Sequence, residues 1–155
     1  FVKSDYENDG VIGIAVDKDY SIVHLENQDM FGTVGFIAEV GLIASENSIP
    51  MDMFVTSEIS VSFTAKTDAI NQNMLKLFNK IATSTLINNV SKISIIGKNI
   101  TNSKTLDEVF SALKSKDIVP LMVSMGQSHN NIGIIVNNSD SDESLIALHK
   151  NLIKK

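Results

Sequence analysis

Cysteine is missing from this chain of 155 residues, and so is arginine, since all 13 basic residues are lysines. Without cysteine the chain has no disulfide, no thiolate ligand for zinc and no thiol nucleophile. Without arginine it lacks the preferred bidentate partner of phosphate and guanine, and it has no arginine finger. The net charge of −5 also opposes nucleic-acid binding, because neutralisation of phosphates supplies most of that affinity.

Long hydrophobic runs are missing as well. The longest ones, such as residues 11–16, are far too short to span a bilayer, and no signal peptide is visible. We therefore expect a cytoplasmic protein that binds no membrane. The content of 43% hydrophobic and 20% charged residues is typical of a folded chain of one or two small domains. The start at Phe1 rather than at methionine indicates a piece of a longer protein.

No catalytic motif of the common hydrolase, P-loop, metalloprotease or dinucleotide-binding kinds occurs. The histidines are His24, His129 and His149. His24 falls in a predicted strand and His149 near the end of the last predicted helix, where a histidine usually packs or compensates the helix dipole. Asp140 and Asp142 lie in a turn before that helix, and capping explains them better than metal binding. We therefore expect a chain that is no enzyme by itself and holds no metal and no cofactor.

Hydrophobic periodicity divides the chain into strands and helices. Strand patterns occur at 10–16, 21–26, 49–53, 59–65, 90–97, 119–123 and 132–136. Helical spacing of apolar residues occurs at 36–47, 68–82, 106–113 and 145–152. The polar run DKDY at 17–20 predicts a turn, so the first two strands are expected to form a hairpin.

The order of these elements repeats, as β-α-β-β-α followed by β-α-β-β-α. Glu39-Val40 corresponds to Glu108-Val109 and Ile49 to Ile118, both at an offset of 69 residues. This half-repeat predicts an α+β fold of two ferredoxin-like domains, with antiparallel sheets and helices on one face. Each unit lacks one strand, and residues 10–16 are left over to complete the second unit. We therefore expect a linker at 1–9, a first domain at 20–87, and a second domain at 10–17 plus 88–155.

The loop at residues 30–35 is informative because it precedes the first predicted helix. Backbone N–H groups in the first turn of a helix lack intrahelical partners and attract anions, including the carboxylate of an amino acid. Gly32 and Gly35 would let a ligand approach the backbone closely. An ordinary glycine turn is the alternative interpretation.

The stretch MDMFVTSE at residues 51–58 favours the interpretation of this region as a ligand site. It is expected to place Asp52, Thr56 and Glu58 near one another in an otherwise apolar setting. A carboxylate beside a helix N-terminus suits both ends of a zwitterion, and two carboxylates suit a ligand with two ammonium groups, such as lysine. A solvated strand edge is the alternative. The loop SMGQSHNN at 124–131 holds the equivalent place in the second repeat, and a bulged connection is slightly favoured there over a second site or an interface.

Two parts of the chain resemble a known family. Residues 27–64, with MFGTVGFIAEV followed by MDMFVTSEISVSFT, resemble the first ACT domain of aspartokinase, the aspartate kinase of lysine, threonine and methionine biosynthesis. Residues 93–136, with ISIIGKNI and LDEVFSALKSKDI, resemble the second ACT domain, and the closing LIALHKNLI resembles the family's terminal motif. The kinase domain that precedes this region in the family has no counterpart here, so ATP and magnesium are expected only for that missing domain.

The resemblance implies a homodimer through the first ACT domain, with a feedback inhibitor bound at the interface. The positions that match the family's effector site are Met30, Thr33, Gly35, Phe36, Ile37, Met51, Asp52, Thr56 and Glu58. Pro50, Gly32 and Asp29 depart from the family pattern, and these departures bear on the identity of the effector.

The function implied is allosteric. An end-product amino acid, L-lysine first, would inhibit the phosphorylation of aspartate by ATP in the N-terminal kinase domain of the parent chain. One alternative is a threonine-sensitive aspartokinase, including one fused to homoserine dehydrogenase. Another is an ACT module that serves oligomerisation alone, and the weakest alternative is a ferredoxin-like nucleic-acid binder.

Overall fold

The computed structural model describes residues 9–30 and 34–153. The chain divides into two compact units, which we call unit 1 (Phe1–Asp17 and Ser91–Lys155) and unit 2 (Lys18–Val90). Unit 2 is therefore inserted into the sequence of unit 1. Two long strands, β1 (Gly10–Glu26) and β4 (Thr83–Lys98), each contribute one part to each unit.

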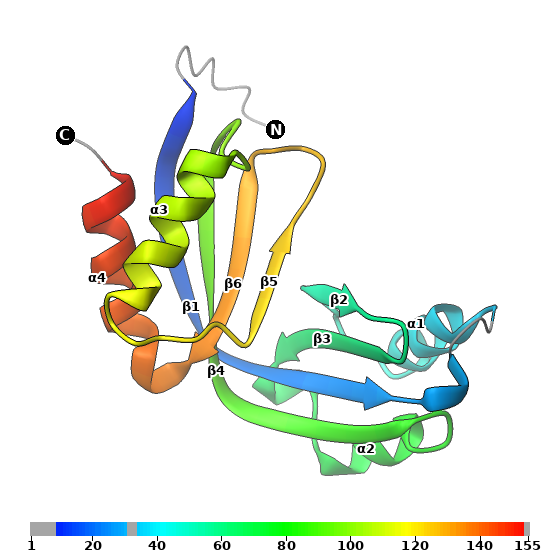
Figure 1. Cartoon of the computed structure of the whole chain (residues 1–155). Helices are drawn as coiled ribbons and strands as arrows, with labels where there is room; N and C mark the ends of the chain where they lie inside the picture. The colour runs from blue at the N-terminus through cyan, green and yellow to red at the C-terminus, as the bar shows by residue number, and fades with distance from the viewer. Residues whose placement is uncertain (1–8, 31–33, 154–155) are drawn as a thin grey trace. The chain divides into compact units, whose positions relative to one another are not determined.

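Unit 2 follows the order β-α-β-β-α-β (Figure 1). Its elements are the second part of β1, a 3-10 turn (Gln28–Met30), α1 (Phe36–Glu46), β2 (Phe54–Thr56), β3 (Ser60–Lys66), a 3-10 turn (Thr67–Ala69), α2 (Gln72–Phe78) and the first part of β4. The strand order is β2-β3-β1-β4, and β3 is antiparallel to both β1 and β2. This is the ferredoxin-like arrangement that the element pattern predicts.

The core of unit 2 lies between one face of this sheet and the two helices. Alternate residues of β1 and β3, such as Leu25 and Phe63, are fully buried, as period-two side-chain alternation requires. Val40 of α1 and Phe78 of α2 pack against them. The ring centroids of Phe63 and Phe78 are 5.6 Å apart.

Unit 1 has the same arrangement with a different chain order. Its elements are the first part of β1, the second part of β4, α3 (Ser103–Lys114), β5 (Met122–Met125), β6 (Asn131–Asn137), a 3-10 turn (Asn138–Asp140) and α4 (Ser141–Leu152). The strand order is β1-β4-β6-β5, so the first strand of the chain fills the outer place beside β4. Alternating isoleucines of β4 and β6 meet Val109 of α3 and Leu148 of α4 in the core. Val109 and its repeat partner Val40 are both fully buried, as the repeat predicts.

The fold class is confirmed, but two local predictions are wrong. Residues 17–20 form no hairpin turn, because DKDY contains no glycine, asparagine or proline that a tight turn favours, and β1 continues through them. Residues 83–89 were missed as a strand, so unit 2 has the fourth strand that the sequence seemed to lack. The polar, half-exposed TSTLINN gives a weak strand signal. Asp19 and Asn89, each with positive φ, mark the places where the two strands pass between units.

Three boundaries also differ from the prediction. The second helix is α2 at Gln72–Phe78, shorter than 68–82, because Asn71 caps it with bonds from Asn73 N and Met74 N. The strand expected at 49–53 begins only at Phe54, and the one expected at 119–123 begins only at Met122. Among the described residues, no helix is long and apolar enough to cross a membrane.

Candidate functional site

The start of α1 differs from the starts of α2 and α3. Asn71 and Asn102 cap the latter two helices through side-chain oxygens, whereas the N-cap of α1 is Gly35, with φ 100° and ψ −6°. Among the described residues no side chain caps α1. The first-turn N–H groups of α1 are therefore without the side-chain acceptor that the other two helices have. They suit a carboxylate, as the sequence predicts.

The two apolar residues that follow Gly35 have different roles. Phe36 is buried in the core of unit 2, whereas Ile37 is half exposed on α1. A cavity of about 380 Å³ lies against Phe36 and is also lined by Asn27, Asp29, Val34, Glu39, Lys80 and Ile81. The polar residues of this cavity were missed, because they come from α1 and from the segments after β1 and α2, which the sequence shows only as unrelated loops.

Asp52 lies two residues before the start of β2. Its N–H donates to Thr64 O at 2.9 Å, while Thr64 N donates to Met53 O at 2.9 Å, so two residues oppose one as in a β-bulge. Met51 packs against the core of unit 2. The bulge ties the backbone at Asp52 to β3 and leaves its side chain exposed.

The Asp52 carboxylate is held by a residue that sequence analysis missed. Tyr20 Oη donates a hydrogen bond to Asp52 Oδ2 at 3.0 Å, and Tyr20 itself is buried. Lys66, which faces Tyr20 across β1 and β3, places its Nζ 4.3 Å from the centre of the Tyr20 ring. Lys66 Nζ also donates to Lys18 O at 3.2 Å. The sequence analysis did not predict this role for Tyr20, because it interpreted residues 17–20 as a turn.

Thr56 and Glu58 lie at the other end of β2. Thr56 pairs with Val61, and Ser57 N donates to Ser60 O in the tight turn that contains Glu58. Asn27 N donates to Ile59 O, so the connection from β1 to α1 leaves the sheet at this same end. Thr56 and Glu58 therefore lie at the end of the sheet where the chain leads into α1.

The expectation that Asp52, Thr56 and Glu58 cluster within one chain is wrong. The extended backbone keeps Asp52 beside Thr64 and Glu58 beside Ser60, and these two positions of β3 are about 14 Å apart at strand spacing. Within one chain these residues form two separate groups. One group is Asp52, and the other is Thr56, Glu58 and the start of α1.

Two predicted residues are described only in part or not at all. The backbone of Met30 lies in the 3-10 turn after β1. Thr33 lies outside the described residues, as does Gly32.

β2 is the end strand of unit 2 in the order β2-β3-β1-β4. Ser57 and Ser60 form a hydrogen-bonded pair, and such pairs alternate along an antiparallel ladder. Val55 therefore directs its N–H and C=O toward β3, whereas Phe54 and Thr56 direct theirs toward the open edge. This edge can pair with another strand.

The equivalent loop of unit 1 has a structural role. His129 O accepts from Ile100 N at 2.7 Å, Asn130 O accepts from Gly97 N at 3.0 Å, and Thr101 Oγ1 contacts His129 Nδ1. These bonds tie the β5–β6 connection to the end of β4, which favours the interpretation as a connection. His24 Nδ1 bonds Ser62 Oγ at 2.8 Å across β1 and β3.

Comparison with known proteins gives one family. Residues 93–152 match the model of the ACT domain. Aspartokinase 1, chloroplastic, of Arabidopsis thaliana is 31% identical over 150 residues, which are 91% of this chain and 26% of that protein. Lysine-sensitive aspartokinase 3 of Escherichia coli is 25% identical over 91% of this chain and 33% of its own length. The chain spans about a quarter to a third of these relatives.

Solved structures agree with the fold. E. coli aspartokinase III in complex with lysine and aspartate superposes with a TM-score of 0.83 at 25% identity, over 97% of this chain and 35% of that one. The ligand-free regulatory subunit of aspartate kinase from Thermus thermophilus has a TM-score of 0.81 at 22% identity, over 94% of this chain and 99% of that one. The chain belongs to the aspartokinase family and corresponds to its regulatory ACT region.

Proposed function

We propose that this chain senses an end-product amino acid, L-lysine, between two copies of unit 2, and so inhibits the phosphorylation of aspartate by ATP in a kinase domain of the parent protein. One observation carries the proposal. The two acidic half-sites lie at opposite ends of an open edge strand, with Asp52 before β2 and Glu58 after it.

A two-fold axis through the middle of β2 unites the half-sites. Antiparallel pairing of β2 with its symmetry mate sets Phe54 against Thr56 of the partner subunit, since both direct their backbone groups outward. The same register sets Asp52 against Glu58 of the partner subunit. Each dimer then has two equivalent sites, and each is built from both chains.

The charges at such a site specify the ligand. Two carboxylates that face each other repel, so the empty pair is unfavourable and a ligand with two ammonium groups removes the repulsion. The first-turn N–H groups of α1 face the ligand carboxylate from the same end as Glu58. L-lysine has these three charges. Its match is supported by one relative, aspartokinase 3 of E. coli, which is named lysine-sensitive and whose solved structure contains lysine.

The mechanism follows from where the site is formed. A ligand that binds only the paired arrangement of unit 2 stabilises that arrangement, and it can shift the equilibrium only by its difference in affinity between the two states. Inhibition requires that the paired arrangement disfavours the active kinase. ATP and magnesium belong to that kinase domain in this proposal.

The proposal includes the domain assignment. The first ACT domain is residues 20–87, inserted into a second ACT domain of residues 10–17 plus 88–155, with residues 1–9 as a linker to the preceding part. The ACT match at residues 93–152 supports the second of these.

Calorimetric titration of the chain with L-lysine, and separately with L-threonine, tests the effector. We expect saturable binding of lysine and none of threonine. Asp52→Ala should weaken lysine binding by about tenfold or more, since a charge-assisted hydrogen bond is lost. Asp107→Ala removes an exposed aspartate of α3 outside this site and is the matched control. Lysine affinity unchanged by Asp52→Ala would contradict the site.

Two other results of this titration would contradict the proposed effector or the proposed function. Threonine binding alone would assign the chain to a threonine-sensitive aspartokinase. A dimer that binds neither amino acid would leave assembly as its role.

A further inference from the structure

Gly41 lies in the interior of α1, although unit 2 itself does not require a glycine there. Glycine destabilises a helix interior relative to alanine, because it loses more conformational freedom on folding. The φ angle of Gly41 is not in the left-handed region, and a Cβ at this position would meet no atom of the described residues within 4 Å. An isolated glycine in a helix is typical of a place where another group approaches the backbone. That group has to come from outside the described residues.

The position of Gly41 on the helix shows which side of α1 is concerned. Glu39 lies two residues earlier, about 200° around the helix, so the two residues point to opposite sides. Glu39 lines a cavity together with residues 80–81, which follow α2. Gly41 therefore lies on the side of α1 away from α2. Because α1 joins β1 to β2 and α2 joins β3 to β4, that side is the side of the open β2 edge.

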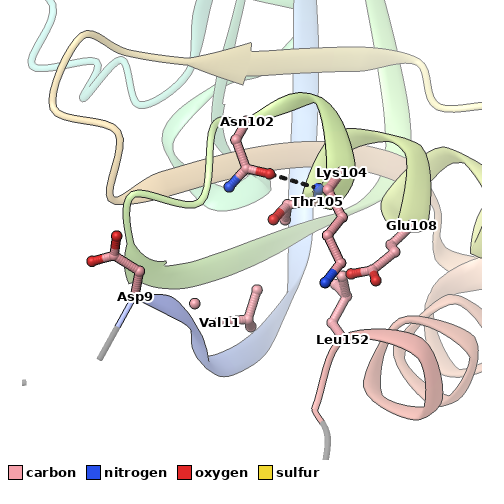
Figure 2. Close-up of a pocket in the computed structure, with 8 residues that line it drawn as sticks. Asp9, Val11, Asn102, Lys104, Thr105, Glu108 and Leu152 are labelled. Atoms are coloured by element: carbon pink, nitrogen blue, oxygen red, sulfur yellow. Dashed lines mark hydrogen bonds between the residues drawn. The ribbon is translucent and has the colours of Figure 1, made fainter. Parts of the chain in front are cut away.

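Unit 1 has the same arrangement, with Phe110 of α3 at the position that Gly41 has in α1, 69 residues further along the chain. Figure 2 shows Glu108, the repeat partner of the glutamate on α1, beside Leu152 at the end of α4. Phe110 lies on the other side of α3 and lines a cavity with residues 119–120, which lead into the end strand β5. Unit 1 thus places an aromatic ring where, among the described residues, unit 2 has open space.

Gly41 belongs to an exposed surface that we call the α1 face. Its residues are Ile37, Ala38, Gly41, Leu42 and Ser45. Ile37 is 51% exposed and Leu42 is 58% exposed. None of the five is charged, whereas the equivalent positions of α3 include an aspartate and a lysine. A two-fold axis sets a surface against its own copy, so an uncharged apolar face can pair with itself without repulsion between like charges. The α1 face therefore suits a second copy of this chain.

We propose that the α1 face packs against the α1 face of a second copy when two β2 strands pair. This inference rests on the proposed lysine sensor, because it uses the same two-fold axis. Since the α1 face is on the side of the open edge, the axis that relates the two β2 strands also brings the two α1 helices together. Gly41 lets the two helix backbones approach closely. The contact holds the start of α1, where the ligand carboxylate binds, in place beside Asp52 of the partner subunit.

Gly41→Phe gives unit 2 the side chain that unit 1 has, and it tests this contact. The open space around Gly41 accommodates the ring, so circular dichroism and the midpoint of urea unfolding of the dilute monomer should change little. The dissociation constant of the dimer, measured by sedimentation equilibrium, should rise at least about tenfold, because the ring separates the helices. Ser111→Phe adds the same ring at an exposed position of α3 and should leave the dimer unchanged. A Gly41→Phe dimer as tight as that of the parent chain would overturn the proposal.

Cross-linking reports the contact directly, because the chain contains no cysteine. Leu42→Cys places a thiol on the α1 face, and Ser111→Cys places one at the equivalent position of α3. A short bifunctional maleimide should join two copies of Leu42→Cys into a covalent dimer, and it should leave Ser111→Cys monomeric on a denaturing gel. Addition of Gly41→Phe to Leu42→Cys should abolish the covalent dimer. Equal cross-linking of the two single-cysteine variants would contradict the contact.

Thr56→Pro, which blocks pairing through β2, separates this proposal from the one on which it rests. If Thr56→Pro abolishes the dimer and Gly41→Phe does not, the helix contact alone is wrong. If neither variant weakens the dimer, pairing through β2 is wrong as well. A parent chain that is monomeric with and without lysine would contradict both proposals.

Discussion

At the scale of single residues, the hydrogen bond between Tyr20 and Asp52 connects the buried sheet to the proposed lysine site. Tyr20→Phe keeps the ring beneath Lys66 and removes only the hydroxyl that holds the carboxylate. We expect lysine affinity to fall about fivefold to tenfold and stability to fall by about 1 kcal/mol, the worth of one hydrogen bond. Calorimetry and urea unfolding measure the two effects. Binding of L-norleucine, which lacks the second ammonium group, should change less than that of lysine.

Gly97 gives a prediction about packing in unit 1. A Cβ there would overlap the carbonyl oxygen of Gly10 and lie 2.5 Å from Ile100 Cγ2. Gly97→Ala should therefore destabilise the chain by about 1–3 kcal/mol, as overpacking does. Gly41, inside α1, has open space around it, and Gly41→Ala should stabilise by about 0.5–1 kcal/mol. Urea unfolding of both variants tests the pair, and equal effects of the same sign would contradict it.

The sequence names candidate residues for the effector site but does not specify which residues they contact. Residue types and the family resemblance predict Asp52, Thr56 and Glu58 as site residues. Their separation along β2 depends on register, which no single-sequence pattern specifies. Tyr20 was missed because its partner, Asp52, is far along the chain and is brought near only by the sheet.

At the scale of elements, β2 decides whether two chains can pair. Thr56 directs its N–H to the open edge, and proline is tolerated at such a position, so Thr56→Pro should leave the monomer folded and prevent dimerisation. Val55 directs its N–H to β3, so Val55→Pro should unfold the hairpin of β2 and β3 and lower stability. Sedimentation velocity and circular dichroism distinguish the two variants. A Thr56→Pro dimer as tight as the parent would exclude pairing through β2.

Helices and short strands were predicted well where their apolar faces are clear, as in α1 and β6. The long strands were not, since β1 and β4 each change their buried partners at the unit boundary, near Asp19 and Asn89. When the pattern of buried and exposed residues changes in the middle of one long strand, the sequence predicts two short strands with a turn between them.

At the scale of the whole molecule, ligand and assembly are coupled. If lysine binds only the pair, its free energy of binding adds to that of association, by about 2.7 kcal/mol for each of the two sites at a lysine concentration one hundred times the dissociation constant. With both sites of the dimer occupied, we therefore expect lysine to tighten the dimer about ten-thousandfold under those conditions. Asp52→Asn should tighten the lysine-free dimer, because the facing carboxylates no longer repel. Sedimentation equilibrium with and without lysine measures both, and a dimer insensitive to lysine would contradict the coupling.

The insertion of unit 2 into unit 1 has a consequence for synthesis on the ribosome. Every strand of unit 2 has left the ribosome before β4 is complete, so this unit can fold while the chain is still growing. The start of β1 must wait beside it with Val11, Ile14 and Val16 exposed, until β4, β6 and α4 arrive to bury them. Such distant partners raise the contact order of unit 1. We therefore expect unit 1 to fold last and to be the place where chaperones bind the nascent chain.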